Sequence, residues 1–207
     1  ARGRLASFAQ GLEELPAALA ASLGARVRLG ARVASVSELD ADAVVLACPA
    51  WTAAPLVSAV SPELSTRLSG IPSVPVAVVH LGFAAEDACG LQGFGFLVPS
   101  GEGGSVLGVL LPSKCFPNRA PEGHLLATVM VGGARDPGAV QASDQTLFEL
   151  AAAALGRFAG VTAAPRFTLA IRHERAPGVD GPVPRPRAPP ATGRPRADVP
   201  RRWPDLG

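Results

Sequence analysis

The chain has 207 residues, of which 48% are hydrophobic and 17% charged, and its formal net charge is +2. This length and composition predict a folded chain with a core of its own, and the small net charge argues against nucleic acid or an anionic membrane as the partner of the whole chain. The three cysteines are widely spaced and odd in number, which argues against a disulfide framework and a structural zinc site. No apolar run approaches the ~20 residues that span a bilayer, and the first residues do not resemble a signal peptide. We therefore expect a cytoplasmic chain.

The first third of the chain predicts helices and short strands. Within residues 12–23, Leu15, Leu19 and Leu23 recur every four positions, and Gly24 follows, which is typical of a helix and its end. Residues 26–29, 31–36 and 42–47 are short apolar runs that predict strands. A short helix is expected from about Trp51 to Val60, and Ser61 followed by proline predicts the cap of another helix.

From Val74 onward the pattern changes to strands separated by glycine- and proline-rich turns, at residues 74–83, 93–99, 105–112 and 124–133. This pattern is typical of antiparallel pairing. Ser143 is expected to cap a long amphipathic helix over 144–160, and a last strand is expected at 166–171. The sequence therefore predicts an α+β fold with a mixed, largely antiparallel sheet and flanking helices.

The C-terminal segment, residues 173–207, has a different composition. Residues 176–207 contain nine of the 21 prolines and six arginines, but few large apolar side chains. Such a segment cannot bury enough apolar surface to offset its chain entropy, so we expect a disordered tail. Its proline-, arginine- and glycine-rich sequence also suggests the hypothesis that this part of the gene is translated in a shifted reading frame. Translation of the other two frames of the gene would test it.

Residues 93–100, GFGFLVPS, alternate two glycines with two phenylalanines inside a predicted strand. Glycine in a strand usually marks a bulge or the close approach of a ligand or of neighbouring backbone. The aromatic side chains by themselves also fit ordinary core packing. The sequence thus leaves open what comes close to these glycines.

Five segments taken in order resemble one family: residues 7–24, 41–50, 76–83, 93–100 and 106–133. Residues 7–24 and 41–50 resemble a helix and a strand of the flavin-containing amine-oxidase-like proteins. The last three segments together are similar to the protoporphyrinogen oxidase family, in which a Gly-Phe-Gly strand is followed by Phe-Pro, Arg-x-Pro-x-Gly and Val-Met-x-Gly-Gly elements. The resemblance covers roughly Leu5 to Arg172.

This resemblance implies an FAD-dependent, oxygen-using oxidase that converts protoporphyrinogen IX to protoporphyrin IX in haem biosynthesis. It also implies that a flat tetrapyrrole substrate lies against Phe94, Leu97 and Met130, which match the family's substrate-binding positions. A bulge at Gly95 could bring both Phe94 and Leu97 to the ligand. Val33 matches a residue whose main chain holds the adenine end of FAD.

The sequence shows no acid/base, metal or nucleophile constellation, so we assign no catalytic residue and no metal ligand. His80 lies inside an apolar strand and is expected to be a structural histidine with a satisfied hydrogen bond. The absence of a catalytic side-chain cluster from the sequence fits the implied chemistry, because a flavin accepts the hydride and the protein orients the substrate and excludes water.

Besides its C-terminal segment, the chain departs from the family in two ways. No GxGxxG follows a strand, so the unit that binds the pyrophosphate of a dinucleotide is missing. The connection between Val36 and Asp42 is also shorter than the family's hairpin. We therefore expect residues 1–50 to be a partial FAD-binding segment and residues 51–172 to be the substrate-binding part.

The expected partner is the family's N-terminal FAD-binding half, without which the chain would be inactive; peripheral membrane association is expected only of the full-length family. Two alternatives remain open on the sequence. One is another amine-oxidase-like flavoprotein, such as an amine oxidase or a carotenoid desaturase. The other is a non-enzymatic porphyrin-binding piece or one subunit of a split enzyme.

Overall fold

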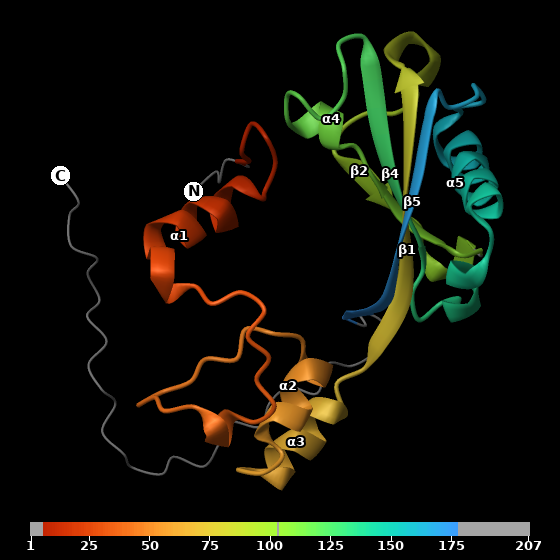
Figure 1. Cartoon of the computed structure of the whole chain (residues 1–207). Helices are drawn as coiled ribbons and strands as arrows, with labels where there is room; N and C mark the ends of the chain where they lie inside the picture. Colours follow the sequence, from red (N-terminus) through yellow and green to blue (C-terminus); the bar gives the residue numbers. More distant parts are fainter. Residues whose placement is uncertain (1–5, 103, 178–207) are drawn as a thin grey trace, which may run out of the picture.

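A computed structural model describes residues 6–102 and 104–177 of the chain, and its centre is a five-stranded sheet (Figure 1). Every neighbouring pair of strands is antiparallel, and the order across the sheet is β2-β3-β4-β1-β5. The strands are β1 (Ser73–Ala84), β2 (Gly95–Leu97), β3 (Val106–Leu110), β4 (His124–Gly132) and β5 (Phe167–Pro177). The α+β prediction with a largely antiparallel sheet is confirmed.

The helices lie before, within and beside this sheet. They are α1 (Glu14–Leu23), α2 (Ala50–Val57), α3 (Pro62–Ser69), α4 (Pro112–Cys115) and α5 (Asp144–Ala159). Figure 1 shows α5 against one face of the sheet, while the segment that contains α1, α2 and α3 curves away on the other side. The two faces of the sheet therefore have different surroundings.

The core lies between the sheet and α5. Val79, Leu81 and Phe83 alternate along β1 and are buried, as are Leu147 and Leu155 on the facing side of α5. Alternation with period two places these strand residues on one face, and a spacing of about two helical turns places the leucines on one stripe. The periodicity of the sequence thus determines which face of the sheet is buried.

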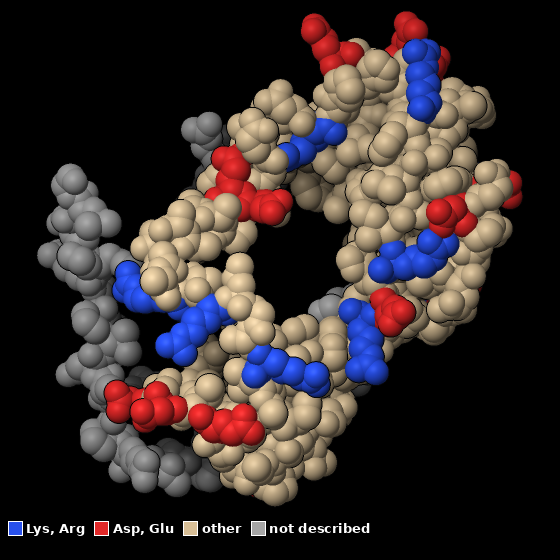
Figure 2. All heavy atoms as spheres, in the orientation of Figure 1, with Lys and Arg blue, Asp and Glu red and all other residues tan. Residues whose placement is uncertain are grey.

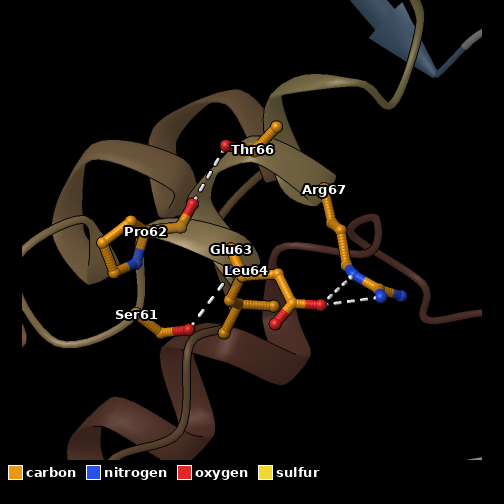
Figure 3. Close-up of polar contacts among 6 residues, drawn as sticks. All are labelled: Ser61, Pro62, Glu63, Leu64, Thr66 and Arg67. Carbon is orange, nitrogen blue, oxygen red and sulfur yellow. Dashed lines mark hydrogen bonds and ion pairs between the residues drawn. The ribbon is translucent and has the colours of Figure 1, made fainter.

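Side-chain caps begin the two helices that follow serines. The Ser143 hydroxyl accepts a hydrogen bond from the backbone N–H of Thr146 at the start of α5 (3.2 Å). At α3 the Ser61 hydroxyl accepts from the N–H of Leu64 (3.3 Å), and one turn later Arg67 pairs with Glu63 at 2.8 Å (Figure 3). Each cap satisfies a backbone donor that the helix leaves unpaired.

The three strands predicted over residues 26–29, 31–36 and 42–47 are wrong. Short 3-10 turns occupy Gly24–Arg26 and Val36–Glu38, and the rest of this region has no strand among the described residues. Most of the apolar side chains that motivated the prediction are exposed, with Leu29 at 91% and Val45 at 89%. A strand needs a partner for its backbone groups, and no described segment pairs with these runs.

At the other end, the predicted boundary of the tail is also wrong. Strand β5 continues to Pro177, and His173 and Ala176 pair with Val76 and Val74 of β1. The first five residues of the predicted tail therefore belong to the sheet, because β1 offers an unpaired edge to them. The rest of the predicted tail, residues 178–207, lies outside the described residues. The hypothesis of a shifted reading frame stays a prediction.

Within residues 6–102 and 104–177, none of the helices has the length and apolar character needed to cross a membrane. The same residues contain no group of three or more His, Cys, Asp or Glu side chains that could hold a metal ion.

Candidate functional site

The sheet face opposite α5 is apolar and largely uncovered. Its first cross-strand row runs through Leu97, Gly108, Met130, Val78 and Ile171, one residue from each strand. Partners in an antiparallel ladder project to the same face, so these five positions form a line across the sheet. We call the surface made by this row and the two rows below the open face.

The second row consists of Gly95, Leu110, Thr128, His80 and Leu169, and the third of Leu126, Gly82 and Phe167. None of the three rows contains Asp, Glu, Lys or Arg. Leu97 is 80% exposed, and Phe167, Leu169 and Ile171 are each exposed by about half. A contiguous apolar surface of this kind marks a site for a ligand or another protein surface.

Two of the predicted substrate residues meet in the first row. Leu97 and Met130 lie on either side of Gly108, which has no side chain to separate them. A Cβ added at Gly108 would be 3.0 Å from Cδ2 of Leu97, so the leucine side chain covers the glycine. Leu97 and Met130 thus share one continuous patch of wall.

The question raised by GFGFLVPS has a structural answer at Gly95. A Cβ at this position would overlap the carbonyl oxygen of Val109, and the residue has φ 140°. The close neighbour is therefore the backbone of β3 and not a ligand. A side chain is excluded by the ladder itself.

The two phenylalanines of this segment have different environments. Phe96 is paired with Val109 and packs against Phe158 of α5, with ring centroids 6.0 Å apart, so it belongs to the core. Phe94 precedes β2, is 55% exposed and takes no part in the core. The core-packing interpretation holds for Phe96, and Phe94 remains available to a ligand.

His80 and Thr128 form the polar pair of the open face. The imidazole Nδ1 and the Thr128 hydroxyl are 3.0 Å apart on adjacent strands. Burial lowers the pKa of His80 below its ordinary value, because desolvation penalises the charged form. The hydrogen bond expected of this histidine is present, and its structural role stays a prediction.

Val33 lies in an irregular stretch between the two 3-10 turns and is 36% exposed. It is not in a strand, and it does not belong to the rows of the open face. The structure therefore brings Leu97 and Met130 together in one row, whereas Val33 and Phe94 both lie outside the rows.

The open face borders a gap in the molecule. Figure 1 shows the sheet on one side and the segment from α1 to α3 on the other, and Figure 2 shows the gap between them passing through the molecule. Arg119, in the loop between α4 and β4, connects the residues before α1 to the sheet. Its Nη2 donates to the Ser7 hydroxyl (2.7 Å) and to the Phe8 carbonyl (2.9 Å). The apolar wall thus faces an accessible space.

Among the described residues, no glycine-rich turn fits the pyrophosphate of a dinucleotide cofactor. The glycine-rich stretch around Gly101 and Gly104 leads into β3 and not into a helix, so it lacks the helix N-terminus that binds a pyrophosphate. The open face, by contrast, has the breadth and the apolar character to bind a flat ring system.

Comparison with known proteins identifies relatives of the chain. Residues 1–174 match the sequence pattern of the family described as flavin containing amine oxidoreductase. The chloroplastic protoporphyrinogen oxidase of Oryza sativa is 31% identical over 170 residues, which cover 70% of this chain and 32% of the relative. Protoporphyrinogen oxidase of Homo sapiens is 38% identical over 146 residues, covering 61% of this chain and 30% of the relative. The chain thus spans about a third of the length of these relatives.

The fold also has a counterpart among solved structures. The crystal structure of a protein from Exiguobacterium sp. 255-15 assigned as a protoporphyrinogen oxidase superposes with a TM-score of 0.67 at 22% identity, covering 83% of this chain and 41% of that one. At this identity the likeness concerns the fold alone. The family match over residues 1–174 shows that the chain belongs to the flavin containing amine oxidoreductases.

Proposed function

We propose that the chain supplies the substrate-binding part of an FAD-dependent, oxygen-using oxidase that converts protoporphyrinogen IX to protoporphyrin IX in haem biosynthesis. The observation that carries the proposal is the open face, three rows of apolar or neutral side chains without a charge. A tetrapyrrole macrocycle has a broad, largely hydrocarbon surface, which is flat in the oxidised porphyrin, and small-molecule sites of this kind are built from apolar walls with few polar groups. The names of the relatives support the choice of substrate.

In this proposal the substrate contacts the side chains of Leu97, Met130 and Phe94. Leu97 and Met130 form the wall over Gly108, and the thioether of Met130 adapts to an irregular ring edge. Phe94, exposed beside β2, stacks against the macrocycle. These side chains orient the substrate and exclude water, and they carry out no proton transfer.

FAD, when bound, supplies the hydride acceptor. In our proposal the main chain at Val33 contacts the adenine end, and the pyrophosphate and the rings are held by protein outside the described residues, in the same or in a second polypeptide. The 207-residue chain is therefore expected to show no turnover by itself. Flavin bound at close to one equivalent in the purified chain would contradict this assignment.

The test is a titration of the chain with protoporphyrin IX, followed by porphyrin fluorescence, with Leu97→Asp as the variant. A carboxylate on the β2 edge of the open face must be desolvated against the ring, so we expect the dissociation constant to rise at least about tenfold. Because Leu97 is 80% exposed, the substitution leaves the core intact.

Leu29→Asp is the matched control, since Leu29 is 91% exposed and lies outside the open face. It should bind as the wild type does. Equal binding by all three proteins, or no binding by any of them, would show that the open face is not the porphyrin site.

A further inference from the structure

A cavity of about 420 Å³ lies at one end of the open face. The third row, Leu126, Gly82 and Phe167, forms part of its lining, so the cavity continues the open face without a break. It lies at the end of the sheet where β4 and β5 begin and β1 ends. Neither the family resemblance nor the proposed contact residues assign a role to it.

The cavity has an apolar floor shaped by a missing side chain. A Cβ at Gly82 would be 3.0 Å from Cβ of Phe167, so the phenylalanine side chain lies over the glycine. Leu125, Ala120 and Pro121 add to the apolar lining. A flat hydrocarbon edge fits such a floor.

Basic groups line the same cavity. Arg119, Arg166 and His124 all contribute to its wall, and no acidic residue does. Arg119 uses Nη2 for Ser7 and Phe8, and among the described residues it has no carboxylate within 4.0 Å.

The guanidinium group of Arg166 forms only a weak ion pair within the chain. Arg166 is 3.4 Å from the Asp87 carboxylate, and both side chains are well exposed, so this pair contributes little. His124 donates Nδ1–H to the carbonyl oxygen of Glu122, which leaves Nε2 toward solvent or a ligand. The cavity therefore combines an apolar floor with two guanidinium groups and no carboxylate of its own lining.

We propose that this cavity binds the carboxylate-bearing edge of an apolar planar ligand, with Arg119 and Arg166 as the carboxylate partners. Guanidinium groups pair with carboxylates through two parallel hydrogen bonds, and an apolar surrounding strengthens the pair. The first and third rows are four residues apart along β4, about 13 Å. A macrocycle on the first two rows therefore extends its acidic side chains to the third. The identity of the ligand rests on the proposed function; the position of its carboxylates rests on the cavity.

The experiment compares protoporphyrin IX with its dimethyl ester, which keeps the ring and removes both charges. Both are titrated at low ionic strength in the same nonionic detergent against the full 207-residue chain and against Arg166→Gln and Arg119→Gln. We expect the wild type to prefer the diacid by about five- to tenfold. Each variant should lose most of this preference while it binds the ester as the wild type does.

Arg67→Gln is the matched control, because Arg67 is exposed on α3 and, within residues 6–102 and 104–177, forms an ion pair with Glu63 alone. It should keep the wild-type preference. Arg119 also holds Ser7 and Phe8, so thermal unfolding of each variant is measured, and Arg166→Gln decides the question if Arg119→Gln is destabilised.

The outcomes separate the two proposals. If the wild type binds both compounds equally and Leu97→Asp weakens both, the carboxylate cavity is refuted and the open face stands. If Arg166→Gln weakens diacid and ester alike, the arginine is only structural and the proposal again fails. Absence of any porphyrin binding by the wild type overturns both.

Discussion

Gly95 combines two constraints that no other residue type satisfies. Its φ of 140° is a conformation that side chains rarely adopt, and the carbonyl oxygen of Val109 occupies the place of a Cβ. The close approach lets β2 pair with β3, and this pairing places Leu97 beside Gly108 in the first row. The glycine therefore determines the shape of the candidate site through the backbone pairing of β2 with β3.

Gly95→Ala is expected to lower the free energy of unfolding by about 2–4 kcal/mol, because the methyl group strains the backbone and pushes β2 away from β3. Chemical denaturation measures the loss. Gly93→Asn is the control: Gly93 has φ 70° with nothing within 4 Å of a Cβ, and asparagine tolerates this conformation, so the loss should stay within about 1 kcal/mol. Equal losses in the two variants would contradict the role of the close approach.

Helices α1 and α5 illustrate how one sequence pattern has two outcomes. Both have an apolar stripe of leucines, but α5 buries Leu147 and Leu155 against the sheet, whereas no residue of α1 is buried. A helix gains most of its stability in a protein from packing such a stripe. The apolar stripe of α1 therefore contributes little to the stability of the described structure.

Leu147→Ala should lower the free energy of unfolding by about 2–5 kcal/mol, the range for a fully buried leucine. Leu19→Ala, at a position 54% exposed on α1, should change it by no more than about 0.5 kcal/mol. Thermal or chemical unfolding of both variants provides the comparison. A large loss for Leu19→Ala would show that the stripe of α1 is covered in solution, for example by a second copy of the chain.

Across the whole molecule, stability is concentrated in the sheet and α5. Residues 26–46 have no strand, and large apolar side chains in this stretch, such as Leu29 and Val45, are nearly fully exposed. In β4, by contrast, Leu125, Ala127, Val129 and Val131 are buried. The strand pairs with β1 over its whole length and with β3 over residues 128–131. Local opening needs little free energy where few contacts are buried.

Amide hydrogen exchange followed by mass spectrometry should therefore show rapid exchange over residues 26–46 and strong protection over 124–132. Addition of the flavin-binding part of a relative, as a separate polypeptide, should slow exchange in 26–46 if that part covers the exposed side chains. Protection of 26–46 equal to that of β4 in the isolated chain would contradict the arrangement described here.

The sequence predicted the helices and the strands from Val74 onward because their signals are local. Ser61 and Ser143 cap helices through contacts within one turn, and the alternation along β1 needs only the neighbouring residues to be read. The runs at 26–29, 31–36 and 42–47 have the same local signal, but a strand exists only if another strand pairs with it. The sequence of a single run does not contain that information.

Sequence by itself determined the family, the antiparallel character of the sheet and the face that α5 buries, since these follow from ordered motifs and from periodicity. Only the tertiary structure decided that Leu97, Gly108 and Met130 lie in one row, that Gly95 makes room for the backbone of β3, and that Arg119 and Arg166 line one cavity. These relations join residues 11 to 47 positions apart, and register and loop closure fix them through contacts that no local pattern records.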